Sequence, residues 1–179
     1  MVGRRRLALV LFCLASHAAT AAPRLTEAEG FALRFDDTQW VQQTAAPPSL
    51  LTLSCIASVC SKGNVVTFVR DERPLIAPGF APFGPGAVTG ASVDLRMQSL
   101  TPASRLLARA PVEPVTLGGT DGYRGLYDIE DRALARTGAL ILLLRRGHGT
   151  LEVRMSANSL SKADIAAFDT LLAGFMLQN

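Results

Sequence analysis

Cysteine and histidine are scarce in this sequence, which has three cysteines and two histidines among 179 residues. Two of these five, Cys13 and His17, lie in the amino-terminal segment. A structural zinc site needs four ligands, usually cysteine or histidine. A catalytic triad needs a nucleophile at a positioned turn such as G-x-S-x-G, which the sequence lacks. The composition therefore argues against a zinc protein and against a triad hydrolase.

Apolar runs long enough to span a membrane are also missing. An apolar run from Leu7 to Ser16 follows three arginines and precedes the small residues of Ala19–Ala21. A membrane span takes about twenty residues, whereas this shorter run between basic and small residues is typical of a secretory signal peptide. We predict that residues 1–21 are removed and that residues 22–179 form a single soluble domain, periplasmic or secreted.

Without this leader, residues 22–179 have no excess of positive or negative charge. The whole chain has 18 Lys+Arg and 15 Asp+Glu, and the leader removes three arginines and no acid. Residues 22–179 therefore have 15 groups of each sign. Because no basic excess remains, we expect neither a nucleic acid nor an anionic membrane surface as a partner.

The remaining cysteines, Cys55 and Cys60, are five positions apart. In an oxidising compartment, two cysteines without a third partner most simply pair with each other. The alternating stretch Leu50–Cys55 and the β-branched stretch Asn64–Arg70 predict a β-hairpin, whose loop such a disulfide closes. A redox-active pair is disfavoured because it prefers C-x-x-C spacing at a helix start. A metal site is disfavoured because further ligands are few.

Four other regions have the patterns of β-strands. Gly30–Trp40 predicts a strand that ends in an acidic turn before Trp40, and Ser92–Gln98 predicts a strand in which every second residue is apolar. Val112–Asp131 predicts two extended segments around a glycine-rich turn. Thr137–Ser159 predicts a hairpin whose first strand is apolar on both faces, as in the centre of a sheet.

Two helices are predicted. The first covers Pro102–Arg109, with Thr101 as its N-cap and Pro111 as its stop. The second begins with a capping-box pattern at Ser161–Asp164. It continues with an apolar stripe at three- and four-residue steps, formed by Ile165, Phe168, Leu171, Leu172, Phe175 and Met176.

The segment Pro74–Gly90 is rich in proline and glycine, which predicts a long loop without regular structure. Phe80 and Phe83 lie within it. Two aromatic residues on a loop can anchor a partner, or they can pack back onto the core. We take Phe80, Phe83 and Trp40 as the candidate partner-binding residues.

The order of these segments resembles the superfamily of photosystem II PsbP proteins, the Ran-GTPase release factor and DcrB-type bacterial exported proteins. The resemblance rests on a strand entry and on a final helix, at Val115, Gly118, Gly119, Tyr123, Phe168, Leu171, Leu172 and Phe175. It implies an α+β fold, a mainly antiparallel sheet layered with helices as an α/β/α sandwich, with a C-terminal amphipathic helix. It also implies an accessory or binding role, because members mostly act in that way and share no catalytic motif.

Groups with catalytic potential are few. His148 lies in a turn beside two arginines, which disfavour its protonated form. Three acidic pairs, which begin at Asp36, Asp71 and Glu130, lack the spacing of a calcium loop. We expect no metal and no cofactor.

The sequence therefore favours a non-catalytic periplasmic or secreted binding or accessory protein. It would act through a sheet face and the proline- and glycine-rich loop on an envelope protein or a small ligand. A small enzyme that uses His148 and a nearby carboxylate is the alternative, and a purely structural role in the envelope is a third possibility.

Overall fold

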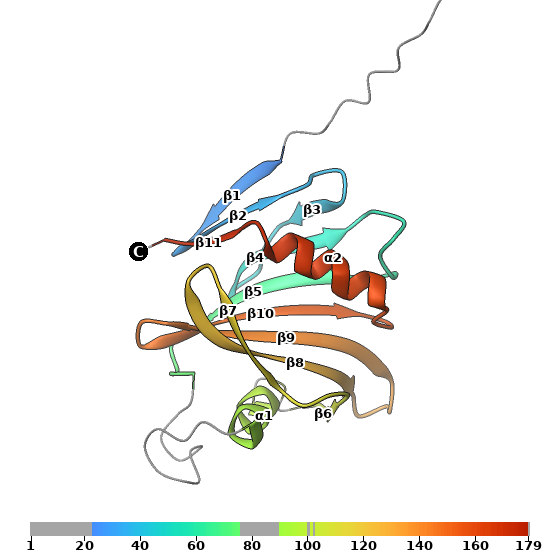
Figure 1. The fold of residues 1–179 in the computed structure, drawn as a ribbon. Helices are drawn as coiled ribbons and strands as arrows, with labels where there is room; N and C mark the ends of the chain where they lie inside the picture. Colours follow the sequence, from blue (N-terminus) through green and yellow to red (C-terminus); the bar gives the residue numbers. More distant parts are fainter. Residues whose placement is uncertain (1–22, 76–89, 100, 102, 179) are drawn as a thin grey trace, which may run out of the picture.

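The computed structural model describes residues 23–75, 90–99, 101 and 103–178 (Figure 1). Two helices lie in this part of the chain, α1 (Gly90–Ser99) and α2 (Lys162–Leu172). The strands are β1 (Arg24–Ala28), β2 (Phe31–Phe35), β3 (Trp40–Gln43), β4 (Ser49–Cys55), β5 (Val65–Asp71), β6 (Arg105–Ala108), β7 (Glu113–Leu117), β8 (Thr120–Glu130), β9 (Arg136–Arg146), β10 (Gly149–Ala157) and β11 (Phe175–Leu177).

The strands form two antiparallel sheets. The large sheet has the order β3-β4-β5-β10-β9-β8-β6, and β7 also pairs with β8. The small sheet has the order β1-β2-β11, so that the end of the chain returns to pair with its beginning. The two helices lie on opposite sides of the large sheet (Figure 1). The predicted α+β fold, a mainly antiparallel sheet layered with helices, is confirmed. The C-terminal helix ends at Leu172, so Phe175 and Met176, which the predicted apolar stripe included, lie instead in β11.

Strand β9 lies in the middle of the large sheet and is buried on both faces. Leu140, Leu142 and Leu144 belong to the core cluster on the side of α2. Ala139, Ile141 and Leu143 belong to a second cluster, which includes α1. Because side chains alternate along a strand, the apolar run of β9 supplies both cores, as the sequence predicted.

The small sheet packs against the large one through three phenylalanines. Phe31 of β2 stacks on Phe68 of β5 with ring centroids 5.0 Å apart, and on Phe175 of β11 at 5.5 Å. All three are at most 4% exposed. Offset aromatic stacking adds about 0.5–1.5 kcal/mol to the burial of each pair, so this cluster joins the two ends of the chain to the large sheet.

The prediction of a strand at Ser92–Gln98 is wrong, because these residues lie in helix α1. Val93 and Met97 are buried, and a spacing of four residues fits one face of a helix as well as one face of a strand. Leu95, expected inside, is 54% exposed, whereas Arg96, expected outside, is buried against Asp71. The prediction assumed that the leucine is buried and the arginine exposed, whereas the helix exposes Leu95 and buries Arg96.

The prediction of a helix at Pro102–Arg109 is also wrong, because Arg105–Ala108 form β6 and pair with β8. Thr101 does not cap a new helix. Its amide donates to the carbonyl of Gln98 and so closes the end of α1. The Gln98 side chain then donates to the Ser104 carbonyl at 2.8 Å and accepts from the Leu106 amide at 2.9 Å, which fixes the start of β6.

Candidate functional site

On the side of α1, half of the large sheet carries side chains that belong to neither core cluster. They project from β4, β5 and β10 and are half-buried, and we call them the open face: Thr52, Ser54, Val65, Thr67, Val69, Arg154 and Ser156. The cluster around α1 instead draws on β8 and β9. Among the described residues, none packs on the open face as α1 packs on its neighbours.

The strand register arranges the open face in rows. Ser54 pairs with Val65, which pairs with Ser156. In the next row Thr52 pairs with Thr67, which pairs with Arg154. One row therefore combines hydroxyl groups with a valine, and the other combines two threonines with Arg154, which pairs with the buried Glu152 at 2.6 Å. The surface offers both hydrogen bonding and apolar contact to a partner.

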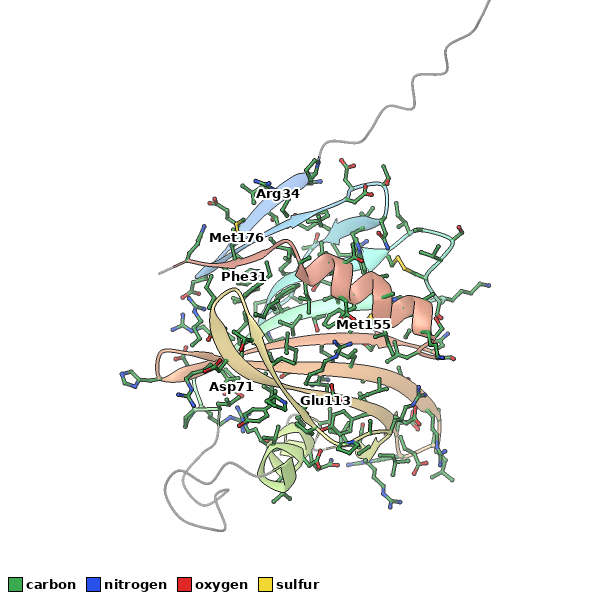
Figure 2. All side chains as sticks on the ribbon, in the orientation of Figure 1. Phe31, Arg34, Asp71, Glu113, Met155 and Met176 are labelled. Atoms are coloured by element: carbon green, nitrogen blue, oxygen red, sulfur yellow. A yellow bond between two sulfur atoms is a disulfide. The ribbon has the colours of Figure 1, made fainter. Side chains whose placement is uncertain are left out.

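An ion cluster around Asp71, which Figure 2 labels, joins the end of β5 to α1. Asp71 at the end of β5 accepts from Arg96 of α1 at 2.5 Å and from Arg73 at 2.8 Å. Burial alone would raise the pKa of Asp71, but the hydrogen bonds from the two arginines outweigh it and lower the pKa to about 2. The cluster fixes α1 against the end of β5 and keeps Asp71 ionised.

The segment that carries Phe80 and Phe83 lies outside the described residues. Its two flanks are described: Leu75 and α1 both belong to the core cluster on the open side of the sheet. The chain therefore leaves and rejoins the described structure on that side. The roles of Phe80 and Phe83 remain predictions.

Trp40 is not placed as the sequence interpretation expected. It is 2% exposed and belongs to the core cluster on the side of α2. It pairs with Cys55 in the register of β3 and β4. Because a buried indole offers little surface, we do not include Trp40 in the open face.

His148 is exposed in the turn between β9 and β10 and contributes to a cavity of about 310 Å³ with Asp71 and Glu72. Within the described residues it forms no hydrogen bond with a carboxylate. Asp71 is held by two arginines, and Glu72 pairs with Arg70 at 2.8 Å. These carboxylates are thus bound to arginines and do not orient His148 as a general base needs.

The three acidic pairs are bound locally as well. Asp36 accepts from the amide and hydroxyl of Thr38 at 2.8 and 2.6 Å. Glu130 pairs with Arg136 at 2.9 Å. In the part of the chain that the structure describes, no three Cys, His, Asp or Glu side chains gather as a metal site would require.

The disulfide between Cys55 and Cys60 is present and closes the loop between β4 and β5, with the two Cα atoms 6.2 Å apart. The loop is also bonded to α2 through Asp164, which is fully buried. Asp164 accepts from the Ser61 amide and hydroxyl at 2.7 and 2.6 Å, and from the Asn64 side chain at 2.8 Å.

Asp164 is also the carboxylate of the predicted capping box of α2. It accepts from the amide of Ser161 at 2.8 Å, while its own amide donates to the Ser161 hydroxyl at 3.2 Å. Sequence reasoning found this local role through the spacing of Ser161 and Asp164. It missed the bonds from Ser61 and Asn64, because those residues are about a hundred positions away and no local pattern marks them.

We expect the variant Cys60→Ser to lower the free energy of unfolding by about 2 kcal/mol, because a short disulfide loop removes about that much chain entropy from the unfolded state. Urea denaturation measures the change. Labelling of free thiols in the purified wild-type protein, without reductant, provides the second test. Two reactive thiols would contradict the disulfide.

No helix within the described residues is long and apolar enough to cross a membrane. No protein-family model and no curated protein sequence matches the chain. The solution structure of cyanobacterial PsbP (CyanoP) from Synechocystis sp. PCC 6803 is similar, with a TM-score of 0.59 and 13% identity, over 90% of this chain and 95% of that one.

The crystal structure of LpqN, described as involved in cell envelope biogenesis of Mycobacterium tuberculosis, is also similar. Its TM-score is 0.52 at 11% identity, over 91% of this chain and 88% of that one. Both likenesses extend over nearly the whole length of each protein, and at such low identity they speak to architecture alone. The chain has a PsbP-like α+β fold.

Proposed function

We propose that this protein is a non-catalytic accessory or binding protein, exported by the signal peptide in residues 1–21, with residues 22–179 acting as a single domain in the periplasm or outside the cell. The disulfide between Cys55 and Cys60 supports an oxidising compartment. The similar fold of LpqN, which is described as involved in cell envelope biogenesis, supports a role in the envelope.

The open face carries the proposal. One face of an antiparallel sheet can face water, but here α2 and α1 cover both faces of β9. On β5, Val65, Thr67 and Val69 are instead only half-buried. Aliphatic side chains interspersed with hydroxyl groups fit a protein surface of similar mixed character, so we propose an envelope protein as the partner.

Phe80 and Phe83 remain part of the proposal, because the segment that carries them begins and ends on the same side of the sheet as the open face. They would add aromatic anchors to a surface that otherwise offers small side chains. The alternative enzyme is not supported by the described geometry, because His148 is exposed and its neighbouring carboxylates are bound to arginines.

The experiment is photo-crosslinking in cells that produce the exported protein. The photoreactive residue p-benzoylphenylalanine replaces Thr67 at the centre of the open face. A matched protein carries it at Ala166, which is exposed on α2 on the opposite side of the sheet. The double variant Phe80→Ala and Phe83→Ala, combined with the photoreactive residue at position 67, tests whether the two phenylalanines contribute to capture.

A further inference from the structure

A groove runs along α2 on the side of the sheet opposite the open face. It consists of two cavities of about 220 and 250 Å³, and Arg124 of β8 is the residue that lines both. One wall is α2 and the other is the hairpin of β7 and β8, which lies beside α2 on the same side of the sheet (Figure 1). Each cavity exceeds the roughly 150 Å³ at which an apolar cavity binds benzene or xenon.

The lining of the groove is mainly apolar. From α2, Ile165 lines one cavity, and Phe168 and Leu172 line the other. These three residues lie on successive turns, so the groove is about 10 Å long at 1.5 Å per residue. Leu140 and Leu142 of β9 form its floor, and both are at most 2% exposed.

The turn of the β7–β8 hairpin packs against the start of β11. A side chain at Gly118 would meet the ring of Phe175 at 3.2 Å, so the turn lies directly against the start of β11. Gly118 also has a φ of 56°, which favours glycine there. The hairpin is thus held at both its base in the sheet and its turn, and the groove has fixed walls.

Charge decides which ligands fit. The charged side chains that line the two cavities are Arg124, Asp169 and Glu113. Arg124 pairs with Asp169 of α2 at 2.9 Å, which joins the two walls. Glu113 lies directly opposite Arg124 in the register of β7 and β8. The lining of the two cavities thus carries two carboxylates and one guanidinium, so it has no net positive charge for an anionic ligand.

We propose that this groove binds a neutral apolar chain, such as the alkyl part of a long-chain alcohol. The mainly apolar lining favours alkyl groups over polar ones. The carboxylate of a fatty acid that approached Arg124 would have to displace Asp169, and Glu113 adds a second negative charge nearby. A fatty acid therefore binds less well than the matching alcohol.

The test uses N-phenyl-1-naphthylamine, a neutral dye that becomes fluorescent in apolar sites, with the purified protein. Saturable binding is expected for the wild type. The variant Val115→Trp fills the groove from β7, where Val115 lines the first cavity, and should weaken dye binding at least tenfold. The matched variant Val41→Trp, on β3 and 38% exposed, should change binding less than twofold.

Displacement of the dye by competing ligands provides the second measurement, which does not depend on the Val115→Trp variant. In the wild type, 1-decanol should displace the dye at concentrations at least fivefold lower than decanoate does. The variant Asp169→Asn should improve displacement by decanoate and leave displacement by 1-decanol unchanged. Absence of saturable dye binding, equal binding by Val115→Trp and wild type, or equal displacement by the two competitors would overturn the proposal.

Discussion

Replacing Asp164 with alanine is expected to lower the free energy of unfolding by about 3 to 5 kcal/mol, because several donors lose their acceptor at about 1 to 3 kcal/mol each. The variant removes one buried carboxylate and leaves donors from Ser61, Asn64 and Ser161 without an acceptor. Two connections are lost together, the N-terminal cap of α2 and the bond between α2 and the disulfide loop. Urea denaturation of the wild type and the variant measures the change.

The control is Asp169→Ala on the same helix. Asp169 is exposed and forms a surface ion pair with Arg124, so its loss should cost less than about 1 kcal/mol. Similar losses for the two aspartate variants would show that Asp164 does not bind the loop to the helix as described.

The pH dependence of Asp164 follows from its surroundings. Burial alone would raise its pKa, but the hydrogen bonds from Ser161 and Ser61 outweigh burial and hold the pKa well below its usual range. Because the folded-state pKa lies below the unfolded value of about 3.9, this stabilisation is fully present above that value and is lost as the pH falls through the lower one. Between about pH 5 and pH 2 the wild type should therefore lose more stability than Asp164→Asn.

Replacing Phe68 with alanine is expected to lower the free energy of unfolding by about 3 to 5 kcal/mol, the usual cost of removing a buried aromatic side chain. Phe68 is 0% exposed and stacks on Phe31, with Phe175 at 6.4 Å on the same cluster. The cavity would lie between the small and large sheets, so hydrogen exchange should increase most in β1, β2 and β11.

Val69 is the matched control for Phe68, because it is the next residue on β5 and projects to the open face. Val69→Ala should cost less than about 1 kcal/mol, since a half-exposed side chain leaves no cavity. If Val69→Ala were as destabilising as Phe68→Ala, the open face would be buried and the proposed binding surface would be contradicted.

The sequence was most informative where local pattern and tertiary environment agree. The apolar run of β9 indicated a strand buried on both faces, and Ser161 with Asp164 indicated the start of α2; both are confirmed. The hairpin with the disulfide of Cys55 and Cys60 is confirmed for the same reason, because strand pattern, turn and compartment all favoured it.

The predictions were wrong where a distant charge decides the environment of a residue. Arg96 is buried only because Asp71, twenty-five positions earlier, neutralises it. No local pattern in Ser92–Gln98 contains that information, so the stretch was interpreted as a strand. The same limit applies to Asp164, whose partners Ser61 and Asn64 come from another hairpin.

The open face could be predicted from the sequence even less well than these elements. A strand pattern shows that Thr52 and Thr67 point away from an apolar face, but it does not show whether a helix covers them. Trp40 was taken as a candidate partner-binding residue, yet it is 2% exposed and belongs to the core cluster on the side of α2. The register of the assembled sheet was needed to define the open face.

Photo-crosslinking from position 67 most directly tests the claim that the open face binds a partner. The protein with the photoreactive residue at position 67 should form a discrete adduct with one envelope protein, whereas the protein with this residue at position 166 should not. The same adducts from both positions, or none from position 67 in correctly exported and folded protein, would contradict the claim.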